Sequence, residues 1–100
     1  MDVLAKFHSV IHTSWRIIIP KATREFYEIE QGDVVELLLI KYQDKKPQIK
    51  KQFLGKVGEH GSVIIPKTVR EVMDLKPKEI VEVIMLDHHK PTMRQVKENK

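Results

Sequence analysis

Basic residues recur at two matching places in the sequence. The segment Arg16–Glu25 reads Arg-Ile-Ile-Ile-Pro-Lys-Ala-Thr-Arg-Glu, and Ser62–Glu71, 46 positions later, reads Ser-Val-Ile-Ile-Pro-Lys-Thr-Val-Arg-Glu. Both copies place a lysine and an arginine where a strand should pass through Pro into a short helix: Lys21 and Arg24, then Lys67 and Arg70. Because the start of a helix already carries partial positive charge, cations there favour an anionic ligand. The repeat therefore predicts anion binding, and the alternative is ordinary solvated Lys and Arg paired with Glu25 or Glu71.

The histidines and hydroxyl residues do not suggest catalysis. His8 and His12 share one face of an expected strand but lie about 13 Å apart at the rise of a strand, and the adjacent His88 and His89 point to opposite faces. A metal site usually needs three or four converging ligands, so no metal site and no cofactor is predicted. The sequence has no Ser/His/Asp arrangement, no glycine-rich phosphate loop and no acidic cluster with metal spacing. We therefore expect that the protein is not an enzyme.

The elements that must position the basic residues repeat in the same order. Each copy is expected to fold as strand, turn, strand, short helix and strand. The first copy should have strands and a helix at Ala5–Ile11, Trp15–Ile19, Ala22–Ile29 and Val34–Tyr42. Its helix should bury a stripe of Ala22, Phe26 and Ile29, and Gly32 should end it.

The second copy shows clearer turn signals. Its elements are predicted at Gln48–Val57, Ser62–Ile65, Thr68 to about Leu75, and Glu79–Leu86. Gly58–Gly61 should form the hairpin turn, and Thr68 with Glu71 should form a capping box. The residues from Asp87 onward are polar and expected to fray, although Met93–Val96 is a candidate edge strand.

The closing strand of each copy carries apolar residues on both faces. Leu38 and Ile40 follow Glu36, and Ile84 and Leu86 follow Glu82, on the side opposite the expected core residues. Such strands are covered on both faces. The repeats and helices could cover them within one chain, or the patch could be an oligomer interface. The two Glu residues are interpreted as outward-facing solubility residues.

Composition limits the class of protein. The 100 residues are 41% apolar and 32% charged, which indicates one globular domain, with repeats at about 5–42 and 51–88 and a polar tail at 89–100. The absence of cysteine, of an apolar span and of a signal sequence predicts a cytoplasmic location. A single asparagine beside many Lys and Glu is typical of thermophiles. Residues 47–100 carry eleven Lys/Arg and seven Asp/Glu, and the pI near 9.4 fits a polyanionic partner.

The repeated Ile-Ile-Pro-Lys-x-x-Arg-Glu block, followed by Gly32-Asp33 and a strand, resembles the swapped-hairpin family. This family includes the AbrB and SpoVT regulators and the MazE-type antitoxins. The resemblance covers about Ala5–Tyr42 and Lys51–His88, and it implies a mostly β fold with two short helices. The implied architecture is a pseudo-twofold β-barrel of two β-β-α-β repeats, as if the usual two chains were fused into one.

The resemblance also implies DNA contacts from the residue that opens the second strand and from the Arg of the helix. These positions are Arg16 and Arg24 in the first copy, and Ser62 and Arg70 in the second. This sequence departs from the family pattern at three positions: Ser62 stands where Arg is common, and Trp15 and Lys78 each stand where Gly is common. The two halves should therefore contact DNA differently, which puts a symmetric palindromic site in doubt. Trp15 is a candidate for stacking on a base or wedging a groove, or for a partly buried hairpin aromatic. His12 and His60, in equivalent turns, are candidates for phosphate contact, as are Lys21 and Lys67.

We therefore expect a DNA-binding protein that acts as a transcription regulator or a chromatin-like architectural factor. The expected partner is double-stranded DNA, with further self-association through the outward apolar strand residues and no membrane contact. The alternative is a MazE-like antitoxin that binds a toxin and its own operator. Members of that type carry a long acidic tail, whereas the residues after the second repeat here are basic.

Overall fold

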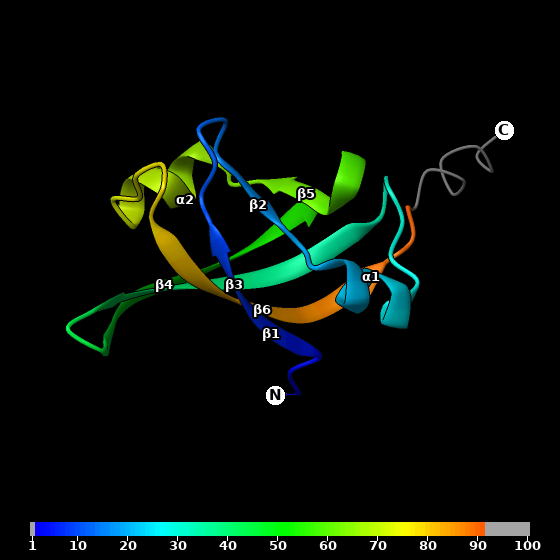
Figure 1. The fold of residues 1–100 in the computed structure, drawn as a ribbon, viewed down its shortest axis with the longest axis horizontal. Coiled ribbons are helices and arrows are strands. Elements are labelled where there is room, and N and C mark those ends of the chain that lie inside the picture. Colours follow the sequence, from blue (N-terminus) through cyan, green and yellow to red (C-terminus); the bar gives the residue numbers. More distant parts are fainter. Residues whose placement is uncertain (1, 92–100) are drawn as a thin grey trace, which may run out of the picture.

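The computed structural model describes residues 2–91, and its secondary structure follows the two repeats (Figure 1). The elements, in chain order, are β1 (Ala5–Val10), β2 (Arg16–Ile18), α1 (Lys21–Tyr27), β3 (Val34–Gln43), β4 (Lys46–Lys56), a 3-10 turn η1 (Glu59–Gly61), β5 (Ser62–Ile64), α2 (Lys67–Val72) and β6 (Ile80–His89). The prediction of a mostly β domain with two short helices is confirmed. Among the described residues, no helix is both long enough and apolar enough to cross a membrane.

The strands of the two repeats are interlaced. One sheet has the order β1-β6-β3-β4, and β2 pairs with β5 in a second, two-stranded sheet. All four strand pairings among the described residues are antiparallel, and each joins one repeat to the other: β1 with β6, β3 with β6, β3 with β4 and β2 with β5. Neither repeat therefore contains the partners that its own strands need. Within residues 2–91 the two sheets share no strand ladder and are linked by the isolated bridge between Val57 and Val63, so a closed barrel is not found there.

Backbone hydrogen bonds between the repeats obey an approximate twofold symmetry. The N–H of Ile19 donates to the carbonyl of Gly61 at 2.9 Å, and the N–H of Ile65 donates to the carbonyl of Trp15 at 2.9 Å. The two donors, Ile19 and Ile65, are 46 positions apart, and so are the two acceptors, Trp15 and Gly61. Exchanging the two repeats therefore converts one hydrogen bond into the other. The sequence repeat thus corresponds to a structural repeat, related by a pseudo-twofold axis.

The core lies between the two sheets. One face of β3 and β6 buries every second residue completely or almost so, including Val35, Leu37 and Val83. Ile17 of β2 and Val63 of β5, both with 0% exposure, face them from the smaller sheet. Both helices pack on this same side, because α2 adds Val69 to the core and Tyr27 of α1 packs against it.

The predicted helix stripe is wrong for α1. Ala22 is exposed and Phe26 is 78% exposed, whereas Ile29, just after the helix, is buried as predicted. The helix is only seven residues long and rotates Tyr27 inward, where its hydroxyl donates a 2.6 Å hydrogen bond to the carbonyl of Leu4. The hydrogen bond of Tyr27, and not an apolar stripe of Ala22 and Phe26, therefore fixes the inward face of α1.

The predicted capping box of α2 is also wrong. The helix begins at Lys67, directly after Pro66, and no side chain caps it. Thr68 is therefore already inside the helix, and its hydroxyl is not at the capping position. The predicted helix ends are wrong as well, because α2 ends at Val72 and not near Leu75, and Glu28, with a φ of 55°, takes the left-handed position after α1 that was expected of Gly32. Gly32 and Lys78 lie later, at matching positions with φ of 98° and 77°.

The outer face of the large sheet is not covered by the helices. The expectation that the helices of the chain cover the apolar residues on this face is therefore wrong. Both helices lie on the core side, and Leu38, Ile84 and Leu86 remain half-buried, although Ile40 is 7% exposed. An oligomer interface at this face stays a proposal.

The expected fraying from Asp87 onward is wrong for the first residues. β6 continues to His89, and Lys90 binds Asp33 at 2.9 Å. The candidate strand at Met93–Val96 lies outside the described residues.

Candidate nucleic-acid interface

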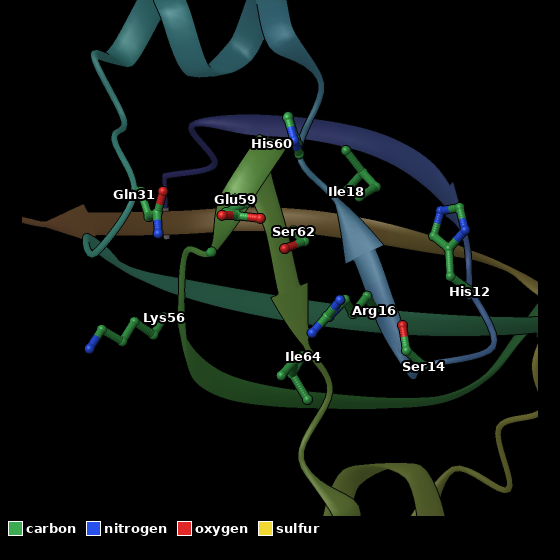
Figure 2. A pocket seen from close by; sticks show the side chains of 11 residues that line it. His12, Ser14, Arg16, Ile18, Gln31, Lys56, Glu59, His60, Ser62 and Ile64 are labelled. Carbon is green, nitrogen blue, oxygen red and sulfur yellow. The ribbon is translucent and has the colours of Figure 1, made fainter.

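An open groove of about 560 Å³ lies on the outer face of the β2–β5 sheet (Figure 2). Most of its lining residues have polar side chains, and they come from the two strands, their turns and two neighbouring segments. The lining residues are His12, Ser14, Arg16, Ile18, Gln31, Lys56, Gly58, Glu59, His60, Ser62 and Ile64. The site is therefore built from both repeats.

Strand alternation explains why these side chains face outward. Ile17 pairs with Val63 in the middle of the small sheet, and both side chains are fully buried. Their neighbours must point the other way, since successive side chains of a strand alternate. Arg16 faces Ile64 across the ribbon, and Ile18 faces Ser62.

The groove collects four of the nine predicted DNA-contacting residues: His12, Arg16, His60 and Ser62. It does not collect Trp15, Lys21, Arg24, Lys67 or Arg70. Sequence reasoning missed Ser14, Gln31, Lys56 and Glu59, which line the groove as well. Lys56 lies two residues before the predicted Gly58–Gly61 turn, and Glu59 lies within it. Their closeness in sequence to this turn was the signal that could have identified them.

Arg24 has a packing role across the pseudo-twofold axis. Its Nε–H donates a 2.9 Å hydrogen bond to the carbonyl of Ile19, and its side chain lies against Gly61 in the turn of the other repeat. A Cβ atom on Gly61 would collide with the guanidinium group. Glycine suits this position because it leaves room for Arg24 and because it adopts a φ of 78° without strain, whereas the equivalent Trp15 adopts a φ of 63°.

Arg70 makes the equivalent contact with a different partner. Trp15 stands where Gly61 stands in the other repeat, and the guanidinium carbon of Arg70 lies 4.7 Å from the centre of a Trp15 ring. This is a cation–π arrangement. Arg70 Nε is buried and has no hydrogen-bond partner among the described residues. Trp15 is half-buried beneath this arginine and packs against the core, which fits the predicted alternative of a hairpin aromatic.

The two arginines do not lie at the helix starts, so the electrostatic reason for expecting an anion beside them does not apply. Both helices are so short that Arg24 and Arg70 lie in the last turn, where a positive charge is favourable. Lys21 and Lys67 do lie at the first position of each helix and are exposed. Lys21 is 4.0 Å from Glu25, a spacing of little energetic weight at the surface. Direct DNA contact by these four residues stays a prediction.

The two acidic groups with lowered pKa lie away from the groove. Burial raises the pKa of Asp33, but hydrogen bonds from Glu30 N and Lys90 Nζ, both 2.9 Å, together hold it below its ordinary value. The hydrogen bond from the Tyr42 hydroxyl, at 2.7 Å, together with Lys6, lowers the pKa of Glu82 against the effect of burial. Glu82 is 5% exposed, so its interpretation as a solubility residue is wrong.

One further cluster on the outer face of the large sheet has metal-ligand chemistry. Ligand atoms of Glu36, Asp87 and His89 lie within 4.8 Å of one another. Gln52 already donates a hydrogen bond to Glu36, and His89 lies 3.7 Å from Asp87. The cluster is formed by the pairing of β3 with β6 around a bulge, which no sequence spacing reveals.

The comparisons give one solved structure that resembles this chain over most of its length. The solution structure of PHS018 from Pyrococcus horikoshii is 55% identical, covers 91% of this chain and 98% of its own, and superposes with a TM-score of 0.81. The chain therefore belongs to the same family as PHS018. No family model matches the sequence, and no curated protein matches it. The source of PHS018, a thermophilic archaeon, is weakly consistent with the thermophile prediction.

Proposed function

We propose that the protein binds double-stranded DNA through the β2–β5 groove and acts as a transcription regulator or architectural factor. The observation that carries this proposal is the convergence of Arg16, His12, His60 and Ser62 from two separate repeats on one solvent-facing groove. Lys56 adds a second cation beside them.

The shape of the groove favours duplex DNA over single strands and RNA. A two-stranded ribbon with outward side chains fits the major groove of B-form DNA, whereas the major groove of A-form RNA is too narrow. Proteins that bind single strands present aromatic side chains on which bases stack. No Phe, Tyr or Trp lines this groove among the described residues, and the ring of Trp15 already lies against Arg70.

The strand pairing supports the swapped-hairpin interpretation of the fold. In that interpretation each repeat gives one β-β-α-β unit, and the units exchange strands around a pseudo-twofold axis. A nucleoid-associated cytoplasmic protein without a cofactor follows from the proposal.

Fluorescence anisotropy with a labelled duplex tests the proposal. With four to six phosphate contacts, the affinity should fall with salt along a log–log slope of about −4 to −5. Arg16→Ala should weaken binding and reduce that slope by about one unit. Lys50→Ala is the matched control, because this exposed lysine lies on β4, paired with Ile40 on the other face of the molecule, and its loss removes the same charge. Absence of binding at low salt, or equal weakening by both substitutions, contradicts the proposal.

A further inference from the structure

We infer that the groove is positively charged at one end of the β2–β5 ribbon and negatively charged at the other, and that it binds a non-palindromic duplex in one orientation. This inference rests on the proposed function and adds to it the kind of site that is recognised. It follows from how the pseudo-twofold axis relates the two ends of the groove.

The axis exchanges the ends of the ribbon, so equivalent residues lie at opposite ends. Arg16 corresponds to Ser62, while Ile18 corresponds to Ile64. Arg16 lies beside Ile64 at one end, called here the Arg16 end, and Ser62 lies beside Ile18 at the other, the Ser62 end. The isoleucines therefore present the same apolar surface at both ends, and the polar residues do not.

Both groove cations lie at the Arg16 end. The bridge between Val57 and Val63 places Lys56 alongside Ile64, in the same row as Arg16. His12 joins this row, because its N–H donates a 2.9 Å hydrogen bond to the carbonyl of Arg16. Figure 2 shows Arg16, Ile64, Lys56 and Ser14 on one side of the groove.

The Ser62 end carries the groove's carboxylate. Glu59 and His60 lie in the turn before Ser62, and Figure 2 shows them with Ile18 on the side away from Lys56. The residue equivalent to Lys56 is Val10, which does not line the groove. The residue equivalent to His12 is Gly58, which has no side chain. One end therefore offers two permanent positive charges, and the other offers a negative charge beside a neutral hydroxyl.

Duplex DNA would meet different chemistry at the two ends. An arginine on the major groove reads guanine through its two acceptors, and a good bidentate contact discriminates against the wrong base by about 5- to 150-fold. A serine hydroxyl accepts several bases with little preference. A palindrome would place identical half-sites at these two unlike ends, so the best site is asymmetric, with the guanine under Arg16.

Selection from a pool of random duplexes tests this inference with three proteins: wild type, Ser62→Arg and Lys50→Arg. The wild type should enrich a non-palindromic motif with a required G·C pair in one half. Ser62→Arg restores the missing charge at the equivalent position, and it should shift the motif towards an inverted repeat and tighten binding to that repeat by about 5-fold or more. Lys50→Arg, on the other face, should enrich the wild-type motif. Ser62→Lys serves as a second variant if circular dichroism shows that Ser62→Arg does not fold.

Two results would overturn the inference while the proposed function stands. These are salt-dependent binding in which the wild type selects a palindrome, or a folded Ser62→Arg or Ser62→Lys protein that selects the unchanged motif. Failure of the wild type to bind any duplex, or tighter binding to RNA or to single strands, overturns the inference and the proposed function together.

Discussion

Replacing Gly61 with alanine should destabilise the protein by about 2.5–5 kcal/mol. Two costs arise at the same residue. The φ of 78° lies in the left-handed region, where a residue with a Cβ loses about 1–2 kcal/mol. The new Cβ would also push aside the guanidinium group of Arg24, and the hydrogen bond from Arg24 Nε to Ile19 O would be lost. A hydrogen bond from a charged group contributes about 1.5–3 kcal/mol.

Urea denaturation of Gly61→Ala, Arg24→Ala and the double variant separates these two costs. Arg24→Ala removes the collision, so adding Gly61→Ala to it should cost only the backbone term of about 1–2 kcal/mol. Gly58→Ala is the matched control, because Gly58 lies in the same turn with a φ of −99°, and an added Cβ there would meet the Ser62 hydroxyl at 3.0 Å and not the Arg24 guanidinium group. A loss below about 1 kcal/mol for Gly61→Ala, or the same loss with and without Arg24, would refute the reasoning.

Three further predictions concern single residues. Asp33→Asn should lower stability by about 2–3 kcal/mol at neutral pH, because Asp33 bonds Glu30 and Lys90. Since folding lowers the pKa of Asp33, its contribution is present above the unfolded pKa of about 3.9 and disappears as pH falls further, so wild type and variant should converge in acid. Urea titrations at several pH values measure this, and a pH-independent difference contradicts it. Lys78→Gly should raise the melting temperature by a few degrees, because Lys78 has a φ of 77° and its N–H still donates to a carbonyl; a lower melting temperature contradicts the strain. Phe26→Ser should change stability by less than about 0.5 kcal/mol, whereas Ile29→Ala should cost about 2–4 kcal/mol, and equal effects in thermal melts would place Phe26 in the core.

The order of elements could be predicted because the sequence states it twice. Alternation marked the strands, and Pro20 and Pro66 marked the transitions into the helices, which begin at the next residue. The inward face of α1 could not be predicted in the same way. Over only seven residues a helical period is poorly defined, and the hydroxyl of Tyr27 decided the orientation.

The candidate site was predicted where the chemistry is local and missed where it depends on pairing. Arg16 and Ser62 were predicted because the swapped-hairpin resemblance implies a DNA contact from the residue that opens the second strand of each repeat. The packing of Arg70 on Trp15 joins residues from different repeats, and nothing near either residue indicates it. Lys56 reached the groove only through the short bridge between Val57 and Val63. These contacts depend on which residues of different strands lie opposite each other, and this register cannot be predicted from the sequence of any one strand.

The interlaced strands also determine how the chain can be made. β1 finds its partner in β6, with Ala5 opposite Met85, so almost the whole chain must leave the ribosome before the first strand can pair. Pairings this distant in sequence slow folding, because a long loop must close before the contact stabilises anything. During synthesis the first repeat therefore emerges with the edges of β1, β2 and β3 unpaired. The β3–β4 hairpin is the pairing that forms locally, across the turn at Asp44 and Lys45, and it is the natural starting point for assembly.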